Sequence, residues 1–306
     1  MLDLWHEALP DLQATADRLA GTAAPYRLAS LRPLPPVMPP GQIFQAGANY
    51  RTHVLDLLAA AERRGDSSDG VGTTDRPRAR RALDERSRTG EPFVFQGSAN
   101  AMVGAEDDVV LPADGSQPDW ELELVAVIGR RARRIRREHA LGCVAGYTIA
   151  NDLTLRDRLE RPDVPGGIDW LAAKNAPTFL PVGPLLVPAA HVPDPMDLRI
   201  TLTVNGRVMQ DESTADMLFG VARLIEYLST VGELRPGDLV LTGSPAGNGS
   251  HHGVFLSPGD VIDGAISGLG RQRNRCVAEP LEAVGEPAIA TGPSTNARSH
   301  ERQERA

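Results

Sequence analysis

Two glutamates separated by one residue lie in the stretch DWELELVAVIG, residues 119–129. The leucines, valines and isoleucine around them are typical of a buried β-strand. Alternate strand side chains point to the same face, so Glu121 and Glu123 would lie roughly 7 Å apart on one face. Two carboxylates on a half-buried face raise each other's pKa unless a cation neutralises them. From this stretch alone, a cation site and an edge strand with a solvated polar face both remain open.

A third carboxylate, Asp152, follows the apolar run VAGYTIA at the expected end of another strand. Carboxylate oxygens from two strands would suit Mg²⁺, Mn²⁺ or Ca²⁺ and would suit zinc poorly. Acidic residues are common at strand ends, so the spacing alone is a weak indication of a metal site.

A candidate base lies in NYRTHVLD, where His53 and Asp56 are three residues apart and would share one face of a helix. A carboxylate beside an imidazole orients the ring and raises its basicity, as a base that activates water requires. The alternative is a surface histidine at a helix start with an accidental acidic neighbour, and the pattern alone favours that alternative.

Lys174 precedes an apolar, proline-bounded run in WLAAKNAPTFLPVGPLLV. Facing a cavity near carboxylates, it would stay charged and could bind a substrate carboxylate or an oxyanion. A solvent-facing lysine fits the stretch nearly as well. The turn LTGSPAGNG, residues 241–249, lacks the Lys-Ser/Thr ending of a phosphate-binding loop, so we do not interpret it as a nucleotide site. His251 and His252 after it are interpreted as exposed loop residues.

The elements that must position these residues are mostly short strands between 93 and 280, bounded by Gly, Pro, Asn or Asp, which predicts an α+β, mainly β fold. Asn205-Gly206 predicts a hairpin, and apolar spacing over 217–228 predicts an amphipathic helix. We expect a small N-terminal segment (1–40, with a helical pattern at 12–21), a catalytic domain (41–284) and a disordered tail (285–306). Residues 64–91 have almost no large apolar side chain, which predicts a mobile insertion, interpreted as a lid because it follows His53.

Composition narrows the class of protein. A net charge of -8 on 306 residues argues against a general nucleic-acid binder, despite the basic run RRARRIRR at 130–137. No apolar run is long enough to span a membrane, and the N-terminus does not resemble a secretion signal, so we expect a cytoplasmic location. Cys143 and Cys276 are interpreted as reduced core residues.

Taken in order, seven motifs resemble the fumarylacetoacetate hydrolase family, in its branch of acylpyruvases and 2-oxo-hexenedioate decarboxylase/isomerases. They extend over residues 42–278 and are ANYRTH, DWELELVAVIG, GYTIANDLTLRD, KNAPTFLPVGP, LTVNGRVMQ, LVLTGSPAGNG and LSPGDVIDGAISGLGRQRNRC. The resemblance implies a rolled β-sandwich with short flanking helices, usually as a homodimer.

The resemblance also implies roles for individual residues. It assigns a divalent metal, Mg²⁺ or Mn²⁺ with Ca²⁺ as an option, to Glu121, Glu123 and Asp152. It assigns catalysis to His53, Asp56, Lys174 and Arg156, and substrate binding to Tyr50 and Ser244. Three positions depart from the family pattern: Asp56 where glutamate is frequent, Leu159 where glutamine is usual, and Ser244 where threonine is usual. These departures bear on the substrate more than on the metal.

The expected function is a metal-dependent hydrolase that cleaves a C–C bond in a 2,4-dioxo acid of the acylpyruvate type, through an enolate held at the metal. His53, oriented by Asp56, would deprotonate the attacking water. The expected partner is a small 2-oxo acid, with no nucleic acid and no membrane. Two alternatives are a metal-dependent decarboxylase or isomerase of an oxaloacetate-type or 2-oxo-hexenedioate-type acid, and a non-catalytic metal-binding scaffold on the same fold.

Overall fold

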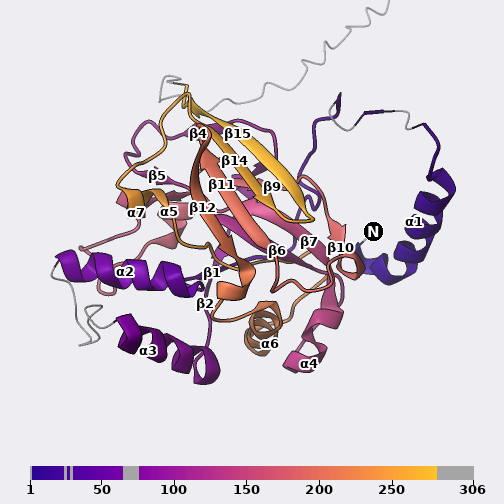
Figure 1. Ribbon diagram of the computed structural model, residues 1–306, viewed down its shortest axis with the longest axis horizontal. Coiled ribbons are helices and arrows are strands. Elements are labelled where there is room, and N and C mark those ends of the chain that lie inside the picture. Colours follow the sequence, from indigo (N-terminus) through magenta and orange to yellow (C-terminus); the bar gives the residue numbers. More distant parts are fainter. Residues whose placement is uncertain (1, 24–25, 28–29, 65–75, 281–306) are drawn as a thin grey trace, which may run out of the picture.

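The computed structural model describes residues 2–23, 26–27, 30–64 and 76–280, which form an α+β fold around two β-sheets (Figure 1). The predicted fold class is therefore confirmed. None of the described helices is long and apolar enough to cross a membrane. The α-helices are α1 (Trp5–Leu19), α2 (Arg51–Arg64), α3 (Arg76–Thr89), α4 (Arg137–Ala140), α5 (Trp170–Lys174), α6 (Val221–Val231) and α7 (Gly249–His252).

The larger sheet is mixed and eight-stranded, in the order β2-β1-β13-β6-β7-β9-β3, with β10 pairing to β7. Its two central strands, β6 and β7, run antiparallel and carry the candidate metal ligands at one end. The bounds are β1 (Ile43–Gly47), β2 (Phe93–Gly97), β3 (Met102–Gly104), β6 (Leu122–Ile128), β7 (Val144–Asn151), β9 (Leu180–Val182), β10 (Val187–Pro188) and β13 (Leu239–Leu241).

The second sheet has five strands in the order β12-β11-β14-β15-β4, and β5 and β8 form a separate pair. One face of β6, with Leu122 and Leu124, belongs to the same core as Ile200 of β11 and Ile262 of β14. The bounds are β4 (Val109–Leu111), β5 (Pro118–Asp119), β8 (Thr154–Leu155), β11 (Arg199–Val204), β12 (Arg207–Ser213), β14 (Val261–Ile266) and β15 (Gly270–Ala278).

Strand β6 is buried on both faces, because Val125 and Val127 on its other face join a second apolar cluster with Leu239 and Leu241 of β13. An edge strand with a solvated face is therefore excluded. Glu121 and Glu123 lie on the side of Val125 and Val127, inside the protein, where a carboxylate needs a cation or hydrogen-bond donors.

Several local predictions are confirmed. Asn205 and Gly206, both with positive φ, connect β11 to β12 in a tight hairpin, as the Asn-Gly pair favours. The amphipathic helix is α6, which buries Leu224, Ile225 and Leu228. Cys143 and Cys276 are buried and free.

Within the insertion predicted to be mobile over 64–91, residues 76–89 form the helix α3, which the sequence pattern did not predict. Two apolar side chains one turn apart, Ala79 and Leu83, are buried, and Asp84 accepts a hydrogen bond of 2.8 Å from Arg51 of α2. Arg76 of α3 also lies 3.9 Å from Asp56 of α2, so a narrow apolar stripe and two ion pairs hold this helix in place. Figure 1 shows α2 and α3 side by side. Residues 65–75 and the tail 285–306 lie outside the described residues, and closure of the insertion over the site stays a prediction.

Candidate active site

Three of the predicted residues come together where β6 begins and β7 ends. Carboxylate oxygens of Glu121, Glu123 and Asp152 lie within 4.8 Å of one another, and all three side chains are buried. The antiparallel register pairs Leu122 with Asn151, and the Asp152 N–H donates to the Glu121 carbonyl over 2.8 Å. The strand pairing therefore gathers the three carboxylates, as expected for an oxygen-ligand site.

Glu123 is held by the turn that follows β13. The Gly243 N–H donates to Glu123 Oε2 over 2.7 Å, and Gly243 has a φ of +89°. A Cβ at this position would lie 2.9 Å from the Ala46 carbonyl oxygen, so only glycine fits. Burial, reinforced by repulsion from Asp152, raises the pKa of Glu123 well above its usual value. The carboxyl is therefore short of positive charge in the protein without an added ion.

Lys174, at the end of α5, lies inside this cluster. Its Nζ is 2.6 Å from Glu121 Oε2, 2.9 Å from Asp152 Oδ2 and 2.8 Å from the Asp152 carbonyl oxygen. Burial opposes its charge, but attraction to Asp152 and both glutamates prevails and raises the pKa of Lys174. The ammonium is therefore charged and fully engaged, which excludes the solvent-facing alternative.

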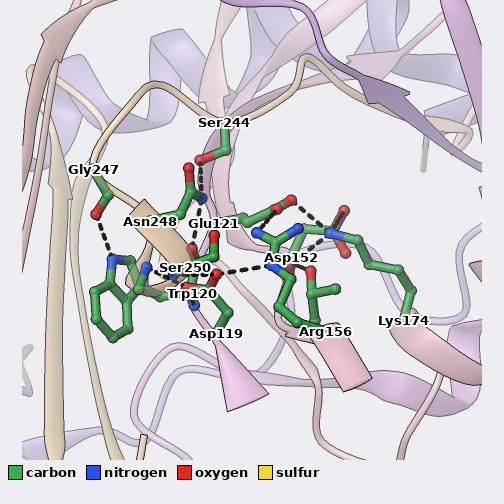
Figure 2. A network of polar contacts seen from close by, with 12 residues as sticks. Asp119, Trp120, Glu121, Asp152, Arg156, Lys174, Ser244, Gly247, Asn248 and Ser250 are labelled. Carbon is green, nitrogen blue, oxygen red and sulfur yellow. Dashed lines mark hydrogen bonds and ion pairs between the residues drawn. The ribbon is translucent and has the colours of Figure 1, made fainter. Parts of the chain in front are cut away.

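Arg156 lies beside Lys174 in Figure 2 and also contacts the cluster. Its Nε donates to Asp119 Oδ2 over 2.8 Å, and its Nη2 donates to Glu121 Oε1. Asp119 is fully buried and also accepts from the Gly249 and Ser250 N–H groups at the start of α7. Asp119 was not predicted as a site residue, although it lies two residues before Glu121 and continues the same alternation of acidic residues.

The charges of the described cluster do not balance. Four buried carboxyl groups (Asp119, Glu121, Glu123, Asp152) face the buried Lys174 and the partly exposed Arg156, so ionisation of all four would leave two negative charges in excess. Burial raises the pKa of Asp152 to about 6, despite its contact with Lys174. An excess of two charges on closely spaced oxygens is what a divalent cation would neutralise, so the residues fit such an ion.

His53 begins α2 and lines a cavity of about 300 Å³ together with Glu121, Asp152, Arg156 and Lys174. Burial lowers the pKa of His53 to about 4, although nearby Glu121 acts in the opposite direction. The imidazole is therefore neutral at pH 7 and able to accept a proton. The interpretation of His53 as a surface histidine is wrong.

The expected pairing of His53 with Asp56 is not seen in the described part of the chain. Asp56 Oδ2 lies 3.3 Å from Nδ1 of His251, and its Oδ1 lies 3.9 Å from Arg76. His53 turns into the cavity, while Asp56 meets the short helix α7. His251 is 44% exposed, as the sequence indicated, but its contact with Asp56 was not foreseen.

The two expected substrate-binding residues differ in position. Ser244 lines the cavity, where its hydroxyl accepts from Gln210 Nε2 over 2.9 Å and donates to the Pro245 carbonyl. Tyr50 is fully buried in the main core and is absent from the described cavity lining. A role of Tyr50 in substrate binding stays a prediction. Leu159, which replaces the usual glutamine, does line the cavity.

Comparison with known proteins identifies the family of the chain. A family model described as fumarylacetoacetate (FAA) hydrolase C-terminal matches residues 42–277. The chain belongs to the fumarylacetoacetate hydrolase family. Among curated members of the family, the chain is 41% identical over 190 residues to the bovine (Bos taurus) mitochondrial oxaloacetate tautomerase FAHD2A, covering 61% of this chain and 59% of that protein. It is also 41% identical over 188 residues to a 2,4-didehydro-3-deoxy-L-rhamnonate hydrolase from Sphingomonas sp. (strain SKA58), covering 60% and 65%. The matches thus span about three-fifths of these relatives' lengths.

A solved family structure contains a metal. Maleylpyruvate hydrolase from Sphingobium sp. SYK-6, in complex with manganese(II) and pyruvate, is similar with a TM-score of 0.68 and 26% identity, covering 91% of this chain and 85% of that one. The relatives of this fumarylacetoacetate hydrolase family member therefore include hydrolases and tautomerases of small oxo acids.

Proposed function

We propose that the protein is a divalent-metal-dependent hydrolase that cleaves the C–C bond of a 2,4-dioxo acid of the acylpyruvate type. One observation carries the proposal: neutral His53 lines the same cavity of about 300 Å³ as Glu121 and Asp152 of the carboxylate cluster. A proton acceptor that is unprotonated at pH 7 thus adjoins a site short of two positive charges.

The proposed ion is Mg²⁺ or Mn²⁺, since carboxylate oxygens suit both. Glu121, Glu123 and Asp152 would hold it, and when bound it would act as a Lewis acid toward the 1-carboxylate and 2-oxo oxygens of the substrate. The manganese and pyruvate in the maleylpyruvate hydrolase structure support this choice.

His53 would take a proton from a water molecule whose oxygen bonds to C4 of the substrate. The C3–C4 bond then breaks with its electron pair going to C3, and protonation of C3 gives pyruvate and the second carboxylic acid. Lys174 and Arg156 keep Glu121 ionised, and both line the cavity, so their charges can stabilise negative charge on the substrate. The expected help from Asp56 would act through its charge, because its contact goes to His251.

The alternative is proton transfer without attack by water, as in a tautomerase, isomerase or decarboxylase. The tautomerase relative at 41% identity favours this alternative, since the same base and the same ion would serve both reactions. Products separate them: hydrolysis gives two acids, decarboxylation gives CO₂, and tautomerisation conserves mass.

Proton NMR of the Mg²⁺-loaded protein with acetylpyruvate, fumarylpyruvate and oxaloacetate, each repeated with EDTA, tests the proposal. EDTA-sensitive formation of pyruvate plus acetate or fumarate would support hydrolysis. Turnover confined to oxaloacetate, without release of a second acid, would move the assignment to the alternative. Binding of Mg²⁺ with no turnover of any 2-oxo acid would support the alternative of a non-catalytic metal-binding scaffold.

We also propose a homodimer and a cytoplasmic location, which both stay predictions. Light scattering after gel filtration tests the first, and fractionation of the source cells tests the second. Because one relative is mitochondrial, recovery of the protein in a mitochondrial fraction would contradict the proposed cytoplasmic location.

A further inference from the structure

The cavity beside the carboxylate cluster has two unlike sides. One side carries the polar and charged groups described above. The other is built of apolar side chains, to which the proposed reaction assigns no role: Leu57, Phe93, Phe95, Leu159, Ile168 and Trp170. Because the substrate's 1-carboxylate and 2-oxo group would occupy the polar side, the remainder of the substrate would meet this apolar wall.

Strand pairing ties the wall to the metal-ligand end. Phe95 of β2 pairs with Gln45 of β1, whose Nε2 donates to Asp152 Oδ1 over 2.6 Å. Phe93 pairs with Gly47, where a Cβ would lie 2.8 Å from the Phe93 ring, so glycine leaves room for that ring. The aromatic residues of β2 and the carboxylate cluster therefore belong to one sheet and are linked through Gln45 of β1.

Trp170, at the start of α5, completes the wall. Its ring stacks on Phe95 with centroids 4.2 Å apart and planes 12° apart, and its centroid lies 5.9 Å from that of Phe93. The same helix ends at Lys174. The aromatic cluster and the buried lysine are thus set by one short element, which fixes the wall relative to the polar side.

The apolar wall, as described, has no charged partner for a second substrate carboxylate. In the described lining, positive charge comes from Lys174 and Arg156, and both are already paired with carboxylates. A substrate carboxylate on the apolar side would lose water without gaining a partner, which is costly.

An apolar group at the distal end of the substrate would instead gain binding free energy on this wall. Phe93 is 46% exposed and Ile168 57% exposed in the protein alone, so a ligand that covers them removes apolar surface from water. An aromatic group could also pack against the stacked pair of Phe95 and Trp170.

Resting on the proposed function, we propose that the site takes 2-oxo acids whose distal part is uncharged and apolar or aromatic, and that it discriminates against dicarboxylates. Phe93, Phe95, Ile168 and Trp170 are the specificity-determining residues. The preferred substrates are then acylpyruvates with a bulky apolar acyl group, in contrast to fumarylpyruvate or oxaloacetate.

Binding of two uncleavable 2-oxo acids tests this selectivity apart from turnover. Calorimetry on the Mg²⁺-loaded protein would compare 4-phenyl-2-oxobutanoate with 2-oxoglutarate, which share the 2-oxo acid and differ at the far end. We expect the phenyl compound to bind about tenfold tighter or more, since an apolar pocket leaves a carboxylate unpaired. Equal affinities, tighter binding of 2-oxoglutarate, or binding of neither compound would overturn the inference.

A charge placed on the wall should change the preference. Ile168→Arg supplies a cation at a half-exposed lining position, so we expect it to reduce the affinity ratio about tenfold. Leu171→Arg is the matched control, because Leu171 is 75% exposed and is absent from the described lining. An equal effect of the two variants would show that net charge, and not the wall, sets the preference.

Turnover separates this inference from the function on which it rests. Should the binding preference hold while neither acetylpyruvate nor benzoylpyruvate is cleaved, the hydrolase assignment falls and the selectivity stands. Should acetylpyruvate be cleaved while the two probes bind alike, the hydrolase assignment stands and the selectivity falls.

Discussion

The Lys174 ammonium donates to Glu121 over 2.6 Å in the interior of the protein, and Lys174 is the only lysine in the sequence. Apart from the histidines, all the other basic side chains of the protein are arginines. A guanidinium is larger and carries five N–H donors, whereas here a single nitrogen meets three oxygens of Glu121 and Asp152. A compact point charge is what this position requires.

Loss of that charge should destabilise the protein strongly. Lys174→Met leaves Glu121 and Asp152 without their shared partner, so we expect the free energy of unfolding in EDTA to fall by about 3–5 kcal/mol. Urea denaturation measures this. Arg131→Met removes an exposed ion pair with Glu233 and should change the free energy of unfolding little, because solvent screens that pair. Similar losses in the two variants would contradict the described cluster.

Removing a carboxylate from the cluster should have the opposite sign in metal-free protein. Glu123→Gln takes away one of two excess negative charges, so we expect a higher Tm in EDTA. We also expect the variant to lose the stabilisation by metal, which for wild type at a hundredfold excess over Kd is about 2.7 kcal/mol. Thermal unfolding with and without Mn²⁺ measures both, and Glu106→Gln at an exposed position is the control. A Glu123→Gln protein with the full metal-induced shift would refute the ligand assignment.

The pKa of Asp152 predicts how pH affects the metal-free protein. Its folded pKa of about 6 lies above the usual 3.8, because burial disfavours its charge. The folded state therefore binds the proton more tightly, and this contribution to stability is present below pH 3.8 and is lost as pH rises through about 6.

Unfolding in EDTA at pH 5 and pH 7 tests this sign. Relative to Asp152→Asn, whose side chain does not titrate, wild type should lose stability between the two pH values. Metal needs the ionised carboxylate, so Mn²⁺ affinity should fall as pH drops through about 6. A wild type and variant with parallel pH profiles would rule out a raised Asp152 pKa.

His53 and Asp56 should contribute unequally to turnover. His53→Gln removes the proposed base, for which we expect a loss of about 10²–10⁴ in kcat with Mn²⁺ affinity retained. Asp56→Asn should cost much less, because its carboxylate contacts His251 and only its charge affects His53. Steady-state kinetics on an acylpyruvate compares them, with His251→Ala as the control for the contact. Equal losses of kcat in the His53 and Asp56 variants would instead support the expected pairing of His53 with Asp56.

The local sequence pattern predicted part of this site. The alternation of Glu121 and Glu123 within one strand, and the place of Asp152 after another, predicted three carboxylates that strand pairing then brings together. Burial of β6 on both faces could have been predicted, since Leu122 and Leu124 alternate with Val125 and Val127 and so make both faces apolar.

The local sequence pattern could not predict the long-range contacts of the site. Gln45 reaches Asp152 from a strand 107 residues away in sequence, and Asp56 of α2 contacts His251 of α7, although the two helices are far apart in sequence. Helix α3 was missed because its order depends on packing of Ala79 and Leu83 against elements outside the segment. Such contacts follow from the tertiary fold and not from local composition.

Hydrolysis at this site is tested most directly by isotope transfer from H₂¹⁸O during cleavage of benzoylpyruvate by the Mg²⁺-loaded protein. We expect one ¹⁸O atom from water in the released benzoate, pyruvate in equal amount, and loss of both products with EDTA or with His53→Gln. Unlabelled benzoate, or a substrate that only exchanges its C3 protons in D₂O and is never cleaved, would contradict hydrolysis and leave proton transfer as the reaction of this site.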